Sequence, residues 1–366
     1  MANINVSKPY LGEEEIKNVV EVMRSGMLAQ GKNVKELERR WAEMCGAKEA
    51  VAVNSGTAAI HASLYAMGIK KGMEVITVPF TFVASSNPIL MQGAKVVFCD
   101  VKEDTFCIDP EAVKEKITKK TKAILGVDLY GQVYDYKALR EIAQDHKLLL
   151  HEDACQAVGA QLDGKTAGTF GDTTSFSLYA TKNIMTGEGG MLTTDSPEMA
   201  EQARRFRHHG QSEQTRYEYY DLGYNYRMMD LQAAIGLAQL DRLPEFTRKR
   251  QENAAALTEG LSKIKGIKTP YVMPGAKHVF HQYTIKVEKD FPLSRDKLKD
   301  HLNSKGVGSG VYYPKPLHLH KIYRDMGYKE GDFPVSEALS QHVLSLPVHP
   351  SLSKADITTI IDAFKL

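Results

Sequence analysis

Two ionisable residues stand at the ends of apolar runs near the middle of the chain. Asp153 closes the run of residues 148–153, and Lys182 lies in a polar, glycine-rich turn after the run of residues 173–178. A carboxylate and an amine in this arrangement suit pyridoxal phosphate, because the amine forms a Schiff base with its aldehyde and the carboxylate keeps its ring nitrogen protonated. We therefore predict pyridoxal 5'-phosphate as the cofactor, with Lys182 as the catalytic residue and Asp153 as the partner of the ring.

Both residues also have a plain structural alternative. Most lysines are solvated surface charges, and an aspartate after a strand often caps the next segment. Glu152 stands beside Asp153 as a competing acid. The residue types alone leave these alternatives open.

Ser55-Gly56-Thr57 lies between a strand-like run, residues 50–53, and a segment with helical periodicity that starts near Thr57. The N-terminus of a helix presents free N–H groups and the positive end of the helix dipole, and a glycine lets an anion approach closely. The same three residues also suit an ordinary helix cap. This segment alone supports a phosphate site and a cap about equally.

The segment GAQLDGKT, residues 159–166, fits the P-loop pattern GxxxxGK[ST]. A P-loop follows a strand directly and opens a helix. Here the preceding apolar run already ends at Asp153, and the following AGTFGD does not begin a helix. We interpret the segment as a β-turn around Asp163-Gly164 and keep nucleotide hydrolysis only as a weaker alternative.

The alternation of short apolar runs with helix-period segments predicts the fold class. Strand-like runs occur at residues 50–53, 74–79, 95–100, 122–127 and 148–153. Repeated strand–helix units favour an α/β fold with a mostly parallel sheet flanked by helices. Ligands of such sheets bind outside the carboxyl ends of the strands, which is where Asp153 is expected.

A smaller C-terminal α/β domain is expected after a long helical connector. Residues 228–261 have strong helical periodicity, which Pro244 is expected to interrupt or bend. We place the large domain at residues 1–245 and the small domain at residues 246–366. In the small domain we expect a strand, two helices and a loop rich in proline and histidine at residues 279–287, 294–305, 354–364 and 312–323.

Composition excludes several classes of function. The chain has 366 residues, 43% of them hydrophobic, and a net charge of +2, so no overall field attracts nucleic acid or a membrane surface. We find no signal peptide and no apolar window long enough to span a bilayer. The cysteines lack metal-binding or disulfide spacing, which favours a reducing, cytoplasmic setting. They are Cys45, Cys99, Cys107 and Cys155.

Three motifs occur in order along the chain: SGT at residues 55–57, EDACQA at residues 152–157, and SFSLYATKNIMTGEGG at residues 175–190. Together they resemble the DegT/DnrJ/EryC1/StrS family of aminotransferases, which act mostly on nucleotide-linked keto sugars. The resemblance extends from Pro9 to LSLPVHP near the end of the chain. It implies the type I fold of pyridoxal-phosphate-dependent transferases and a homodimer with shared active sites.

The resemblance also assigns roles to individual residues. The cofactor residues would be Ser55, Gly56, Thr57, Phe82, Asp153, Gln156, Ser177, Lys182 and Asn225. The substrate residues would be Met27, Leu28, Arg227, Tyr313 and His318. Phe82 would stack on the ring, Gln156 would lie near its phenolic oxygen, and Ser177 would contact the phosphate. Asn225 and Arg227 would reach the neighbouring subunit's site.

The implied reaction moves an amino group from L-glutamate to the keto group of a nucleotide-linked sugar, through a Lys182 aldimine and pyridoxamine phosphate. Lys182 favours a transaminase, because the dehydratase branch of the family has histidine at this position. The chain departs from the family pattern at Asp128, where the family usually has histidine. Two alternatives stay open: an aminocyclitol-type ketone as substrate, or a non-catalytic ligand-binding protein. We expect no metal, since His318-Leu319-His320 has no further ligands at suitable spacing.

Overall fold

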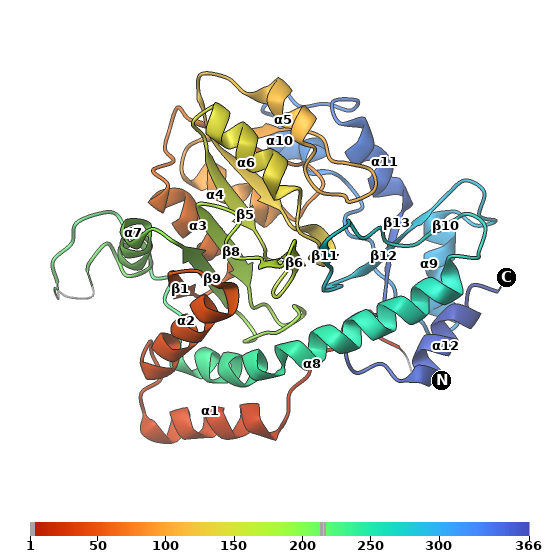
Figure 1. The fold of residues 1–366 in the computed structure, drawn as a ribbon, viewed down its shortest axis with the longest axis horizontal. Helices are drawn as coiled ribbons and strands as arrows, with labels where there is room; N and C mark the ends of the chain where they lie inside the picture. The colour runs from red at the N-terminus through yellow and green to blue at the C-terminus, as the bar shows by residue number, and fades with distance from the viewer. Residues whose placement is uncertain (1–3, 213–214, 216, 366) are drawn as a thin grey trace.

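The computed structural model describes residues 4–212, 215 and 217–365. A seven-stranded mixed sheet with the order β1-β9-β8-β5-β4-β2-β3 forms its centre (Figure 1). The strands are β1 (Glu49–Val53), β2 (Glu74–Thr77), β3 (Lys95–Phe98), β4 (Thr121–Val127), β5 (Leu149–Asp153), β8 (Thr173–Ser177) and β9 (Gly190–Thr194). All neighbouring pairs from β8 to β3 are parallel, and β9 is antiparallel to both β8 and β1. The predicted α/β class with a mostly parallel sheet is confirmed.

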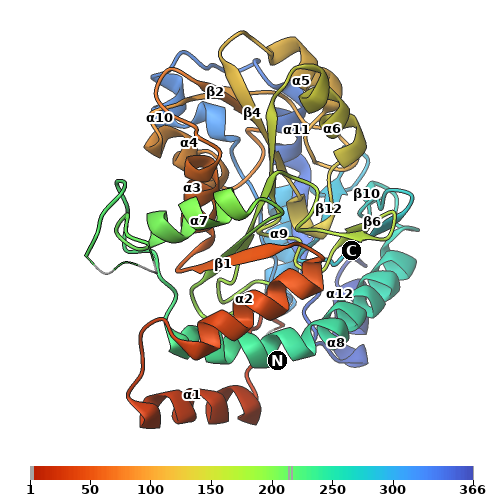
Figure 2. The same cartoon turned by 60° about the vertical axis from the view of Figure 1, so that its left-hand side comes forward.

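Helices cover both faces of the sheet (Figures 1 and 2). Those that follow or flank its strands are α2 (Lys32–Cys45), α3 (Gly56–Ala66), α4 (Asn87–Met91), α5 (Pro110–Lys116), α6 (Tyr136–Asp145) and α7 (Pro197–Arg207). Alternation along β1 shows how the faces divide. Val51 packs in one cluster with α3 and α7, whereas Ala50 and Ala52 pack in another with α2. Successive strand residues point to opposite faces, so both sides of β1 are buried.

The long helix α8 (Asp230–Leu261) connects the two ends of the molecule (Figure 1). The expectation that Pro244 interrupts this helix is wrong. The helix continues through Pro244 to Leu261, and its packing on α1, α2 and α12 stabilises it as one element. Helix α1 (Glu13–Ser25) packs on the outer side of α8 near its start (Figure 2).

The C-terminal part contains a three-stranded sheet with the order β10-β12-β13. Its elements are β10 (Ile267–Lys268), β12 (Tyr283–Val287), α9 (Arg295–Ser304), α10 (Lys321–Arg324), α11 (Pro334–His342), β13 (Val343–Leu346) and α12 (Lys354–Asp362). The strand expected at residues 279–287 is shorter than predicted, and the expected loop at residues 312–323 contains α10 and a short 3₁₀ turn, Leu317–Leu319. The expected boundary at residue 245 falls inside α8.

Residues 161–166 form a β-hairpin. Strands β6 (Gln161–Leu162) and β7 (Lys165–Thr166) pair antiparallel, and Asp163 and Gly164 between them have φ values of 51° and 78°. Positive φ at both central residues defines the Asp-Gly hairpin turn of type I′. The predicted turn is confirmed, and the P-loop alternative is wrong because no helix follows this segment.

None of the helices in the described part of the chain combines the length and apolar character that a bilayer crossing requires. Within the same residues no cluster of histidine, cysteine and carboxylate side chains could hold a metal ion.

Candidate active site

A cavity of about 430 Å³ lies at the carboxyl ends of β1, β5 and β8. It brings together most of the predicted cofactor residues and one predicted substrate residue. These are Ser55, Gly56, Thr57, Phe82, Asp153, Gln156, Ser177, Lys182 and Tyr313. They come from segments far apart in the sequence, and parallel strands bring their carboxyl ends to one edge of the sheet.

Strand alternation separates the two neighbouring acids at the end of β5. Asp153 lines the cavity, where Ser85 Oγ donates to its Oδ2 at 2.6 Å and Cys155 N donates to its Oδ1 at 3.2 Å. Glu152 is fully buried and accepts from Gly168 N, Phe170 N and Thr174 Oγ1. The carboxylate available to a ligand in the cavity is therefore that of Asp153.

Lys182 lies in the turn between β8 and β9, and its side chain lines the same cavity as Asp153. Burial lowers the pKa of Lys182, while the acidic groups of Cys155 and Asp153 act in the opposite direction. A lower pKa increases the fraction of neutral amine, which is the form that attacks an aldehyde. The surroundings of Lys182 therefore favour a nucleophilic amine.

The N-terminus of α3 forms the third side of the cavity. Ser55 caps the helix, with its Oγ accepting from Ala58 N at 3.1 Å, so the predicted cap is present. The first N–H groups of a helix have no intrahelical acceptor, so those of Gly56 and Thr57 can bind an anion. A Cβ atom on Gly56 would stand 2.8 Å from Ser177 Cβ, which shows how closely α3 approaches the end of β8. This cradle, an amine and a carboxylate form the donor set that pyridoxal phosphate requires.

Aromatic and amide groups also line the cavity. The rings of Phe82 and Tyr313 are stacked with centroids 6.2 Å apart, and Phe82 is 56% exposed. Gln156 Oε1 accepts from Tyr130 N at 3.0 Å, and its Nε2 donates to the Tyr313 hydroxyl at 3.2 Å. Burial raises the pKa of Tyr313, which keeps that hydroxyl protonated.

Several cavity residues were not predicted from the sequence. Ser85 belongs to this group, and Thr81 Oγ1 in turn lies 3.0 Å from Ser85 Oγ. The others of note are Tyr179, Thr181, Glu188, His281, Gln282 and Tyr312. Thr81 and Ser85 follow the end of β2, a position that could have indicated them. His281 and Gln282 come from the C-terminal part, and no local spacing points to them.

Five predicted residues lie outside this cavity. Met27 and Leu28 are exposed on the connection between α1 and α2. Asn225 and Arg227 lie beside the chain's own β1–α3 turn, where Asn54 Nδ2 donates to Asn225 O at 3.3 Å. His318 is fully buried, and its Nε2 lies 2.9 Å from Glu337 Oε1.

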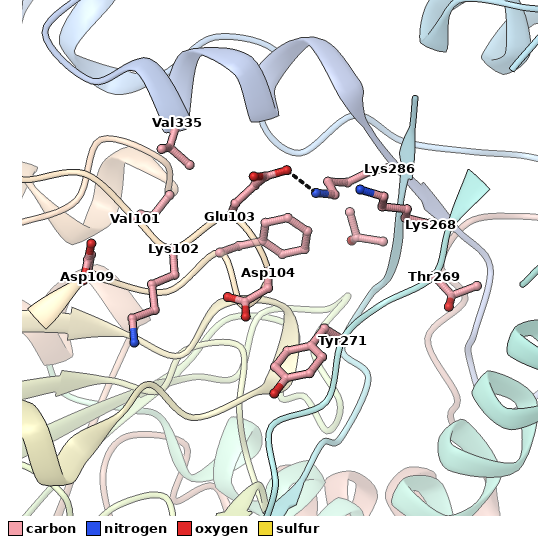
Figure 3. Close-up of a pocket in the computed structure, with 12 residues that line it drawn as sticks. Val101, Lys102, Glu103, Asp104, Asp109, Lys268, Thr269, Tyr271, Lys286 and Val335 are labelled. Atoms are coloured by element: carbon pink, nitrogen blue, oxygen red, sulfur yellow. Dashed lines mark hydrogen bonds and ion pairs between the residues drawn. The ribbon is translucent and has the colours of Figure 1, made fainter. Parts of the chain in front are cut away.

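Figure 3 shows a second cavity, of about 610 Å³, between residues 101–109 and strands β10 and β12. Lys286 Nζ pairs with Glu103 Oε1 across it at 2.7 Å. Its lysines are matched by carboxylates, so it offers no excess charge to an ionic ligand. It contains none of the predicted site residues, and the chemistry lies in the smaller cavity.

The sheet order and the cavity that brings together Lys182, Asp153 and the N-terminus of α3 are those of an aminotransferase of the pyridoxal-phosphate-dependent type I fold. The pattern of the DegT/DnrJ/EryC1/StrS aminotransferase family matches residues 9–365, and the chain belongs to this family.

Relatives support this assignment over nearly the whole chain. The spore coat polysaccharide biosynthesis protein SpsC of Bacillus subtilis is 42% identical, with 98% of this chain and 95% of SpsC aligned. GDP-perosamine synthase of Caulobacter vibrioides is 37% identical, with 99% and 98% aligned. The crystal structure of S. venezuelae DesV with a ketimine intermediate has a TM-score of 0.92 at 35% identity, and it covers 96% of this chain and 93% of DesV. The sugar aminotransferase Spr1654 of Streptococcus pneumoniae in its PLP form, described as putative, has a TM-score of 0.94 at 31% identity, covering 99% and 98%.

Proposed function

We propose that this chain transfers an amino group from L-glutamate to the keto group of a nucleotide-linked sugar, with pyridoxal 5'-phosphate held covalently by Lys182. The observation that carries the proposal is that Lys182, Asp153 and the N-terminus of α3 all line one cavity. When bound, the cofactor supplies an electron sink for the carbon that gains or loses the amino group.

The residues of the chain divide the remaining work. Ser55, Gly56, Thr57 and Ser177 would bind the phosphate group, and Phe82 would lie against the ring face. Asp153, fixed by Ser85, would hold a proton on the ring nitrogen. The amine of Lys182, once freed by the arriving amino donor, would carry a proton to and from the substrate carbon.

The proposed sugar substrate rests on the relatives. GDP-perosamine synthase acts, by its name, in forming a nucleotide-linked amino sugar, and SpsC belongs to polysaccharide biosynthesis. Sequence identities of 37% and 42% over nearly the full length make a similar substrate class the simplest proposal. Tyr313 and exposed groups around Phe82 are the candidates to contact it. Met27, Leu28, Arg227 and His318 remain proposals that depend on a partner subunit or on substrate-induced rearrangement.

A cytoplasmic homodimer is part of the proposal. Large hydrophobic side chains are exposed on α1 and the turn after it, and on the segment before α8. They are Ile16, Met23, Met27, Leu28, Tyr219, Tyr220, Leu222 and Met229. Large exposed apolar side chains concentrated in two segments are typical of an interaction surface, and a second copy would cover them. Asn225, in the same segment, would then contribute to the cofactor site.

The chain is proposed to divide at residues 245 and 246 into a large and a small domain.

The visible absorption spectrum tests the proposal. Purified protein with added pyridoxal phosphate should show the band of the lysine-bound cofactor, and L-glutamate should diminish it. Lys182→Ala should remove the band and all transamination while the fold persists, because a partly buried turn lysine contributes little to stability. Lys165→Ala, at the exposed hairpin lysine, is the matched control and should behave as wild type. Transamination by the Lys182→Ala protein would refute the assignment.

A further inference from the structure

Arg250 is a buried cation in the middle of α8. Its side chain is 5% exposed, and no described carboxylate pairs with it. Its Nη1 donates to the carbonyls of Phe280 at 3.0 Å and His281 at 3.3 Å. Its Nε has no hydrogen-bond partner among the described residues. A buried guanidinium that lacks a counter-ion is costly unless an anion joins it.

Arg250 lines a small cavity of about 80 Å³. This cavity shares His281, Gln282, Thr181 and Tyr312 with the cavity that contains Lys182. The two spaces therefore adjoin, and a molecule that reacts at Lys182 can extend one end toward Arg250.

The other groups around this small cavity also suit an anion. Gln282 Oε1 accepts from Ser345 Oγ at 2.8 Å, which leaves the amide nitrogen of Gln282 as a donor toward a ligand. His349 is 5% exposed, and its Nδ1 has no partner among the described residues. Burial and the nearby cations Lys182 and Arg250 lower the pKa of His281 well below its usual range, so this ring is neutral. No described acidic side chain lines the cavity.

We infer that this cavity is the site for a carboxylate of the amino-acid donor, bound by Arg250 and Gln282. The inference rests on the proposed transamination and adds the residues that recognise its donor. A carboxylate has few heavy atoms and fits a space of about 80 Å³, whereas a nucleoside diphosphate does not. The planar guanidinium also matches a carboxylate well.

Two variants test the inference, and a third serves as control. Arg250→Met removes the cation, but it also removes the bonds to two carbonyls and could disturb folding. Gln282→Glu keeps Arg250 and the bond from Ser345, and it places a competing negative charge in the cavity. Arg248→Met makes the same change as the first variant at an exposed position on α8, where Arg248 pairs with Glu252 in solvent.

The measurement is the dependence of the cofactor-band decrease on L-glutamate concentration, compared with the reverse half-reaction driven by the amino sugar. We expect the apparent Kd for L-glutamate to rise about 30-fold or more in Arg250→Met and Gln282→Glu, since loss of a buried charged pair costs at least about 2 kcal/mol. The apparent Kd for the amino sugar should stay within about twofold. Arg248→Met should match wild type in both. Calorimetric titration with glutarate, which cannot react, should show the same loss of affinity.

An unchanged Kd for L-glutamate in a folded Gln282→Glu protein would overturn the inference. Weaker binding of the nucleotide sugar in place of L-glutamate would also overturn it and assign Arg250 to a phosphate. If L-glutamate does not change the cofactor band of the wild-type protein, the proposed donor itself is refuted. This result is obtained without the variants and is therefore distinct from a failure of the inference about Arg250.

Discussion

Asp128 offers a quantitative test of which buried carboxyl group near the cavity carries a proton. It is fully buried, and its Oδ1 accepts from Tyr134 N at 3.0 Å. Burial and the charge of Glu152 raise the pKa of Asp128 well above its ordinary value. Burial raises the pKa of Glu152 as well, but Glu152 has three donors and Asp128 has one, so the proton of this pair lies on Asp128. Asp128→Asn, which cannot ionise, should therefore preserve the fold.

The sign of the effect follows from linkage. The unfolded chain loses the Asp128 proton above about pH 4, whereas the folded chain retains it. Asp128 therefore lowers the free energy of unfolding as the pH rises, by about 1.4 kcal/mol per pH unit, until the folded pKa is reached. Asparagine removes this loss. Relative to wild type, Asp128→Asn should gain up to about 4 kcal/mol between pH 5 and pH 8.

Urea unfolding of the cofactor-free protein measures this difference at matched protein concentration and at several pH values. Asp325→Asn is the control, because Asp325 is exposed and pairs with Lys321 in solvent. The control should differ from wild type by less than about 0.5 kcal/mol at every pH. A difference between Asp128→Asn and wild type that does not change with pH would show that Asp128 is ionised in the folded protein, contrary to this reasoning.

Three further predictions concern the site and its surroundings. Gly56→Ala should weaken cofactor binding about tenfold in an absorption titration, because the new Cβ would lie 2.8 Å from Ser177 Cβ. Burial lowers the pKa of His151 to about 3, so the unfolded state binds more protons and the free energy of unfolding falls as the pH drops below about 6.5. His151→Asn should remove about 2 kcal/mol of this loss between pH 7 and pH 5, measured by urea unfolding. Trinitrobenzenesulfonate should label Lys182 of the cofactor-free protein at lower pH than exposed Lys165, and Asp153→Asn should lower that pH further.

The central strands could be predicted because their signal is local. Strand β4, for example, is buried on both faces and contains a continuous apolar run at residues 123–127. Strand β9 has no such signal, since its residues GMLTT follow a glycine-rich turn. Its place depends on pairing with β1 and β8, and on Gly190, where a Cβ would lie 2.2 Å from Ser55 O. Long-range packing of this kind cannot be inferred from a short segment.

The same distinction applies to the site. Asp153 ends β5 and Lys182 follows β8, the parallel neighbour of β5, so chain order and strand ends indicate that they meet. Arg250 and Gln282 reach the same region from α8 and from the segment before β12. Their contribution depends on how the C-terminal part packs on the sheet. The expectation of an interruption at Pro244 is wrong for a related reason, since α8 is stabilised by its packing on α1, α2 and α12, which residue type alone does not reveal.

The buried side chain of Glu152 also explains why Asp153 points into the cavity. Glu152 and Asp153 are adjacent on β5, so their side chains point to opposite faces of the sheet. The donors Gly168 N, Phe170 N and Thr174 Oγ1 fix Glu152 on its face. A shift of β5 by one residue would break these bonds and would turn Asp153 away from the cavity. The hydrogen bonds of Glu152 thus specify the register that presents Asp153, and the proton on Asp128 avoids a second negative charge beside Glu152.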